Sequence, residues 1–120
     1  MSDLSTQLHL HLLAEPQPSL INVTFESLAE KLQAIDRIHF EMDGSFVWTG
    51  DSPHPWQLDG MVYDLGQQIQ RIELKGQCPR DPWQQLLLAL NHPTQPLLAY
   101  NLLTSQFVTI EQLESLLWSR

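Results

Sequence analysis

The chain has 120 residues, of which 42% are hydrophobic, and its fourteen acidic and six basic residues give a formal charge of −8. This length predicts a single domain over residues 1–120 with one core. The few Lys and Arg residues exclude a nucleic-acid or anionic-membrane surface, because both need clustered cations. No apolar run approaches the roughly 20 residues of a membrane span. One cysteine, and no basic residue ahead of the first apolar stretch, indicate a reducing cytoplasm.

The N-terminal segment Thr6–Leu13 alternates between leucine and polar residues, which is typical of a half-buried strand. We expect this strand to lie at the edge of a sheet or to form an ordered arm. Glu15–Ser19 contains two prolines and predicts a short linker. Residues 1–18 are therefore assigned to a strand or arm with its linker, and residues 24–120 to the main core.

A helix followed by four antiparallel strands is predicted next. Thr24 can cap a helix over Phe25–Ile35, whose apolar residues recur at helical spacing. The four strands are expected at Arg37–Met42, Ser45–Thr49, Gln57–Asp64 and Ile69–Lys75.

Two Asp-Gly pairs, Asp43-Gly44 and Asp59-Gly60, lie within this predicted four-strand region. A three-residue loop ending at Gly44 pairs Phe40 with Phe46 and Ile38 with Trp48, which places all four apolar side chains on one face. Asp59-Gly60 can be a hairpin tip or a bulge inside the third strand. We favour the bulge, because Leu65–Gln68 already supplies a turn after that strand.

The C-terminal third reads as helix, strand and helix. Asp81 is expected to cap the first of these helices, with Pro82 at its first position and Gln84 completing a capping box. Leu97–Leu103 predicts a buried strand, with a further short strand at Phe107-Val108. Thr109 and Gln112 form a second capping box for the last helix. The predicted fold is α+β, with a mostly antiparallel sheet of five to six strands and three helices packed on it.

Two positions could carry side-chain chemistry. His9 and His11 project from the same face of a strand and could hold a metal together with a distant carboxylate, or they could form the polar side of an exposed strand. Cys78 lies between Lys75 and Arg80, just ahead of a predicted helix, which favours a reactive thiolate. The alternative is a small residue in a strand-to-helix connection.

Acidic residues near the turns are explained by turn chemistry. Asp43, Asp51 and Asp59 belong to glycine-containing turns, where the Asp side chain bonds the local backbone. The chain has no phosphate-binding glycine loop, serine nucleophile elbow or dinucleotide fingerprint. We therefore predict no catalytic residue and no cofactor.

The segment Gly50–Trp56 is the predicted binding loop. Its prolines restrict the backbone and lower the entropy lost on docking, and its tryptophan offers a large apolar anchor. The alternative is an ordinary loop with the tryptophan folded into the core. The candidate binding residues are Asp51, Pro53, His54, Pro55 and Trp56.

The order of elements in this short, acidic, leucine-rich chain resembles the type III secretion chaperones. A strand that ends in an acidic-Gly turn, Phe40-Glu41-Met42-Asp43-Gly44, is the local point of similarity. The resemblance spans about Thr24 to Trp118 and implies a small homodimeric α/β protein that holds a partner polypeptide. It assigns no functional residue.

The sequence leads to three functional hypotheses. The first is a non-enzymatic protein-interaction domain, chaperone-like or adaptor, which forms a homodimer and binds a protein or peptide through a sheet face or edge or the last helix. The second is a small-ligand or metal-binding domain, including a hydrolase. The third is an accessory subunit that is stable only with its partner.

Overall fold

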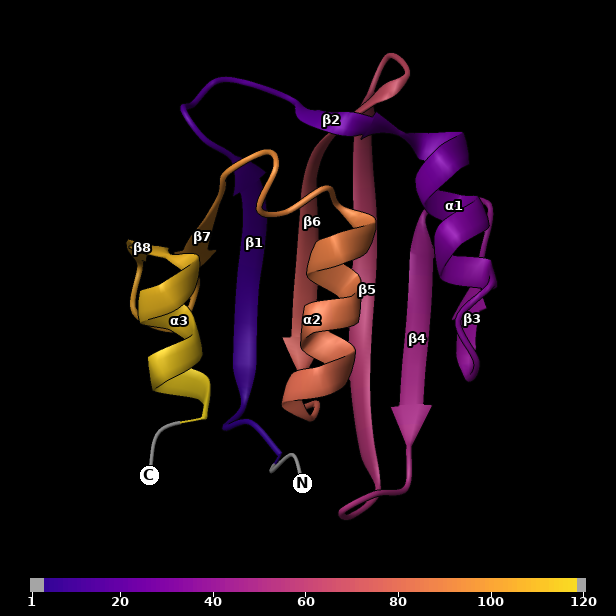
Figure 1. Ribbon diagram of the computed structural model, residues 1–120, viewed down its shortest axis with the longest axis vertical. Coiled ribbons are helices and arrows are strands. Elements are labelled where there is room, and N and C mark those ends of the chain that lie inside the picture. The colour runs from indigo at the N-terminus through magenta and orange to yellow at the C-terminus, as the bar shows by residue number, and fades with distance from the viewer. Residues whose placement is uncertain (1–3, 119–120) are drawn as a thin grey trace.

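The computed structural model describes residues 4–118 and consists of one sheet with three helices on one of its faces (Figure 1). The elements in chain order are β1 (Leu8–Ala14), β2 (Ile21–Thr24), α1 (Phe25–Gln33), β3 (Ile38–Phe40), β4 (Ser45–Gly50), β5 (Trp56–Leu65), β6 (Gln68–Gly76), α2 (Arg80–Ala89), β7 (Leu97–Asn101), β8 (Gln106–Thr109) and α3 (Ile110–Leu117).

The strands follow the order β3-β4-β5-β6-β1-β7-β8, and β2 also pairs with β6. Every pairing is antiparallel. The α+β class, the antiparallel sheet and the three helices are confirmed. The sheet has eight strands, so the prediction of five to six is wrong. The strand that the sequence analysis missed is β2, which has four residues that are alternately buried and exposed and lies between the proline linker and α1.

The position of β1 corrects the sequence prediction of an edge strand or arm. β1 lies between β6 and β7, with Leu10 opposite Leu74 on one side and Leu12 opposite Ala99 on the other. Leu8, Leu10 and Leu12 are fully covered because they face the helices. Period-two alternation shows that one face of a strand is buried, but it does not show how many neighbours the strand has.

The first hairpin has the predicted register. Ile38 pairs with Trp48 and Phe40 with Phe46. The backbone N–H of Glu41 donates to the carbonyl of Ser45, which leaves a three-residue loop. Gly44 ends this loop with a φ of 96°, a conformation that glycine adopts without steric cost.

The Asp59-Gly60 step is neither a hairpin tip nor a bulge. It lies in the continuous strand β5, where Gly60 pairs with Phe46 and with Leu74 in unbroken register. The bulge between β5 and β6 falls at Tyr63/Asp64 instead. A Cβ on Gly60 would overlap the ring of Phe46. This glycine is therefore required by a ring that packs on the strand, rather than by a turn.

Two of the three predicted helix caps are confirmed. The Thr24 side chain accepts from Ser27 N–H, and Thr109 and Gln112 form the expected capping box. The cap at Asp81 is wrong, because α2 begins two residues earlier than predicted, with Pro79 as its N-cap and without a side-chain cap hydrogen bond. Asp81 and Pro82 instead occupy the first turn, where a carboxylate suits the helix dipole and a missing N–H costs nothing.

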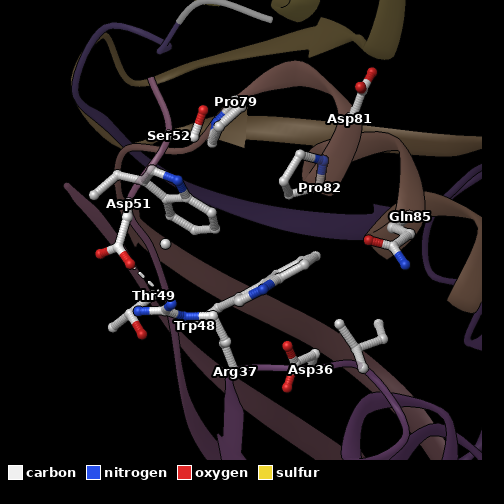
Figure 2. Close-up of a pocket in the computed structure, with 13 residues that line it drawn as sticks. Asp36, Arg37, Trp48, Thr49, Asp51, Ser52, Pro79, Asp81, Pro82 and Gln85 are labelled. Carbon is white, nitrogen blue, oxygen red and sulfur yellow. Dashed lines mark hydrogen bonds and ion pairs between the residues drawn. The ribbon is translucent and has the colours of Figure 1, made fainter. Parts of the chain in front are cut away.

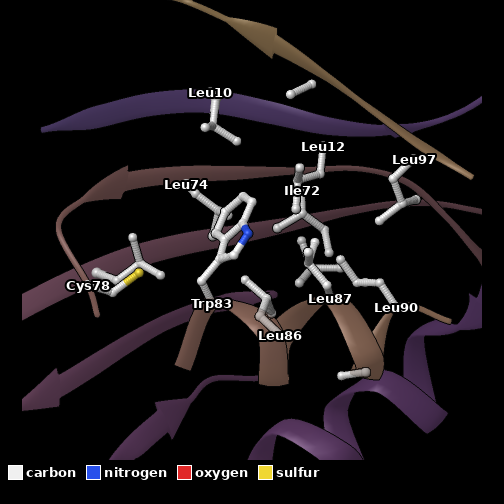
Figure 3. Close-up of a cluster of buried hydrophobic side chains, with 14 of the residues drawn as sticks. Leu10, Leu12, Ile72, Leu74, Cys78, Trp83, Leu86, Leu87, Leu90 and Leu97 are labelled. Carbon is white, nitrogen blue, oxygen red and sulfur yellow. The ribbon is translucent and has the colours of Figure 1, made fainter. Parts of the chain in front are cut away.

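The core lies between α2 and the centre of the sheet (Figure 3). Trp83 and Leu86 of α2 and its C-cap residue Leu90 are fully buried against β1 and β6. The Trp83 indole N–H donates to Glu114 of α3 at 3.0 Å, and its ring lies 5.8 Å from that of Trp118. Between residues 4 and 118, no helix has the length and apolar character needed to cross a membrane.

Candidate functional site

The sheet has one face that no helix covers, here called the open face. The three helices lie on the same side of the sheet in Figure 1, and the strand residues that alternate with the buried ones point the other way. Apolar and aromatic side chains on the open face are Leu13, Val47, Met61, Tyr63, Leu98, Tyr100 and Phe107. Its charged and histidine side chains are His9, His11, His39, Asp59, Arg71, Glu73 and Lys75.

A hydrogen-bond network centres on Glu73 of β6. One carboxylate oxygen lies 2.7 Å from Nε2 of His9, and the other accepts from the Tyr63 hydroxyl at 3.2 Å. The Arg71 guanidinium stacks 3.9 Å above the Tyr63 ring. Three adjacent strands, β1, β6 and β5, therefore hold these four side chains in a fixed arrangement.

Two side chains in and beside this network, Glu73 and His11, have lowered pKa values. Hydrogen bonds from His9 and Tyr63 lower the pKa of Glu73. Partial burial lowers the pKa of His11, aided by the charges of Arg71 and His9 and opposed by that of Glu73. His9 and His11 do share a face, as expected, and Glu73 is a carboxylate within reach. Among residues 4–118, however, no three His, Cys, Asp or Glu side chains are grouped so that they could hold a metal ion. The metal site stays a prediction.

The second candidate is a pocket of about 420 Å³ on the helix-covered side, at the end of the sheet where β4 stops and β5 starts. Three segments far apart in sequence form it: the α1–β3 connection, the β4–β5 loop with its flanking strands, and the first turn of α2 (Figure 2). This volume lies at the lower end of the range for small-ligand sites.

Two tryptophans form the apolar wall of the pocket. The rings of Trp48 and Trp56 lie 5.9 Å apart in an edge-to-face arrangement, and the two residues are only 4% and 9% exposed. The α-carbon of Gly50 fixes the position of Trp56, because a Cβ at this glycine would overlap the indole. Neither indole N–H donates to any described residue.

Acidic side chains dominate the polar lining. Asp36, Asp51 and Asp81 contribute carboxylates, and Arg37 is the only basic residue between positions 4 and 118 that lines the pocket. Arg37 forms an ion pair with Asp51, because its guanidinium lies 2.9 Å from the Asp51 carboxylate, and Figure 2 marks this pair with a dashed line. Asp36 and Asp81 make no ion pair within the described chain.

The predicted binding loop contributes part of this pocket. Asp51 and Trp56 line it, whereas Pro53, His54 and Pro55 do not. The tryptophan is folded inward, as the alternative expected, yet it still borders the pocket. Sequence reasoning missed the contributions of Trp48, Asp36 and Asp81, since these residues are brought together only by the packing of α1 and α2 on the sheet.

Cys78 lies inside the core and is 0% exposed. Burial raises the pKa of its thiol to about 12, which is opposite to the direction expected from the sequence. Its backbone N–H donates to the Ser5 hydroxyl, and Ser5 N–H donates back to its carbonyl. These two bonds hold the N-terminal segment against the connection that leads into α2, so the role of Cys78 in this structure is a packing role.

Comparison with protein-family models, with curated proteins and with solved structures found no significant match to this chain. The resemblance to type III secretion chaperones therefore stays a prediction, and the functional argument rests on the two surfaces described above.

Proposed function

We propose that this protein is a non-enzymatic protein-interaction domain that forms a homodimer through the open face of its sheet. The observation that supports this proposal most directly is the composition of that face. Leu13, Leu98, Tyr100 and Phe107 lie on neighbouring strands, and the Tyr100 and Phe107 rings are only 4.8 Å apart. A contiguous apolar and aromatic surface of this kind is typical of an interaction site.

The charge of the open face suits contact with a second copy. The whole chain carries a formal charge of −8. On the open face, however, Arg71 and Lys75 are matched by Asp59 and Glu73, which lie on adjacent strands. Two faces whose charges are balanced in this way can approach each other without net repulsion.

The size of the face is also appropriate. Seven strands spaced by about 4.8 Å, with a mean strand length of about 21 Å, give an area of roughly 700 Å². A typical stable interface buries about 800 Å² on each partner. The edges are less suitable, because β3 and β8 have only three and four residues, and short edge strands disfavour edge-to-edge pairing. The open face is therefore favoured over the edges for pairing.

The test is the molar mass of the purified protein by light scattering, together with its dependence on concentration. We expect twice the chain mass of 13.8 kDa. Leu98→Lys places a charge in the proposed interface and should convert the dimer to a monomer. A wild-type protein that remains a monomer at high concentration would refute the proposal.

A matched control separates the interface from general effects of the substitution. Leu88 lies on α2, on the opposite side of the sheet, and is 66% exposed. Leu88→Lys introduces the same charge on a leucine outside the open face, so the dimer should persist. If both variants dissociate equally, or if only Leu88→Lys does, the open face is not the interface. Both variants should keep the far-UV circular dichroism of the wild type.

The proposal includes a cytoplasmic location, supported by the acidic composition and by a single cysteine that forms no disulfide. Two of the large exposed apolar side chains, Leu103 and Leu116, line a pocket together with Leu8 and Leu10 on the helix-covered side of the sheet, near α3. They offer a partner polypeptide a second apolar surface, separate from the open face.

A further inference from the structure

We infer that the pocket between α1, α2 and the β4–β5 loop binds a basic side chain, Lys or Arg, presented by an extended peptide segment of a partner protein. This site lies on the helix-covered side of the sheet, so it does not depend on self-association through the open face. The inference rests on three properties of the pocket: its charge, its unused hydrogen-bond donors and the character of the α2 N-terminus.

The first property is an unbalanced negative charge. Of the three carboxylates that line the pocket, Asp51 is paired with Arg37 at 2.9 Å. Asp36 and Asp81 have no basic partner among residues 4–118. They lie on different segments, the α1–β3 connection and the first turn of α2, on the two sides of Trp48 in Figure 2. Each of the two carboxylates therefore adds to the negative potential that an incoming cation meets at the pocket.

The second property is the state of the two indoles. Trp48 and Trp56 are more than nine-tenths buried, and neither N–H has an acceptor in the described chain. The only fully enclosed side-chain nitrogen or oxygen without a partner in residues 4–118 is Nδ1 of His92. Both indole nitrogens therefore keep some accessible surface, and both residues line the pocket. They can donate to the main-chain carbonyls of a bound peptide, while their rings contact the stem or charge of a basic side chain.

The third property excludes an anion. A helix N-terminus commonly binds phosphate or carboxylate groups through its free N–H groups. In α2 this capacity is reduced, because Pro82 has no N–H and Asp81 places a negative charge in the first turn. The three properties together fit a peptide that carries a positive side chain and neutral backbone acceptors, and they do not fit a phosphate or a nucleotide.

The test uses capped tripeptides as probes: acetyl-Gly-Arg-Gly-amide and acetyl-Gly-Lys-Gly-amide, with the Gln and Glu versions as neutral and acidic controls. Binding is followed by the indole N–H resonances of ¹⁵N-labelled protein. The basic peptides should shift the Trp48 and Trp56 resonances and leave Trp83 unchanged, because the Trp83 N–H already donates to Glu114. Added salt should weaken binding.

Substitutions of the acidic residues measure how much each carboxylate contributes to binding of the basic peptides. Asp36→Asn and Asp81→Asn should each weaken the basic peptides by about twofold to fivefold, as expected for exposed ion pairs. Asp64→Asn is the matched control, since Asp64 is also exposed but lies at the far end of β5 from Trp56. It should leave the affinity unchanged.

Three results would overturn the inference: no shift with either basic peptide at millimolar concentration, equal shifts with the Glu peptide, or equal weakening by Asp64→Asn. The measurement is repeated on Leu98→Lys. If the wild type is not a dimer but the basic peptides still bind, the proposed function fails and the pocket inference holds. If the wild type is a dimer but the basic peptides do not bind, the pocket inference fails and the proposed function holds.

Discussion

The position of Trp56 depends on the absence of a side chain at Gly50, and this gives a sharp test of how the pocket is built. In Gly50→Ala the new Cβ would overlap three atoms of the Trp56 indole. The ring cannot move far, because it is 9% exposed and packs edge-to-face on Trp48 at 5.9 Å. Overpacking of this kind costs about 1–3 kcal/mol. Alanine in place of glycine recovers about 0.5–1 kcal/mol by restricting the unfolded chain.

The expected net loss is therefore about 1–2 kcal/mol in the free energy of unfolding. With a urea dependence of about 2 kcal/mol/M, the midpoint should fall by about 0.5–1 M. In a Trp56→Leu background the overlap disappears, so Gly50→Ala should become neutral or stabilising. A double-mutant cycle over these four proteins measures the coupling directly.

Gly60→Ala is the matched control, because its Cβ would overlap the ring of Phe46 in the same way, but outside the pocket. Both glycine variants should be destabilised by similar amounts. Only Gly50→Ala should move the Trp48 and Trp56 indole resonances and weaken binding of the basic tripeptide. If Gly50→Ala stabilises the wild-type protein, or if its effect is the same in the Trp56→Leu background, the packing argument is wrong.

Two further predictions follow from the shifted pKa values. Because burial raises the pKa of Cys78 to about 12, a thiol reagent should label the native protein no faster than it unfolds, and fully in denaturant; rapid labelling of the native protein would contradict its buried position. The folded state holds the pKa values of His11 and Glu73 below those of the unfolded chain, so unfolding free energy should fall as pH drops below 6.5 and again below 4.5. In His11→Gln the first decrease should be smaller, measured by urea unfolding over a pH series, and an unchanged decrease would remove His11 as its cause.

Local signals in the sequence were sufficient wherever the structure depends on near neighbours. The hairpin around Gly44 was predicted to its register, because a shift of one residue would have exposed Phe46 and Trp48. The caps at Thr24 and Thr109 were likewise confirmed, since each depends on a side chain and a backbone N–H three residues apart.

Long-range packing was not accessible in the same way. β1 is central because residues near 73 and 100 pair with it, and nothing within Leu8–Ala14 records that pairing. Gly60 was assigned to a turn or bulge because Asp-Gly is typical of turns, whereas its actual reason is the ring of Phe46, fourteen residues away along the chain. For the same reason only Asp51 and Trp56 of the pocket were predicted, since Asp36 and Asp81 approach them only through the packing of two helices.

The two surfaces lie on opposite sides of one rigid sheet, and this arrangement decides how they can work together. Trp48 and Trp56 point toward the helices, while Leu98 and Tyr100 alternate with buried residues and point away from them. A dimer formed through the open faces would leave both pockets on its outer surfaces, facing in opposite directions. It could then hold two basic segments at once, either from two partner molecules or from distant parts of one. Linked binding of this kind raises the apparent affinity well above that of a single pocket. If the proposed dimer forms, two modest pockets on it would therefore be enough to hold a partner firmly.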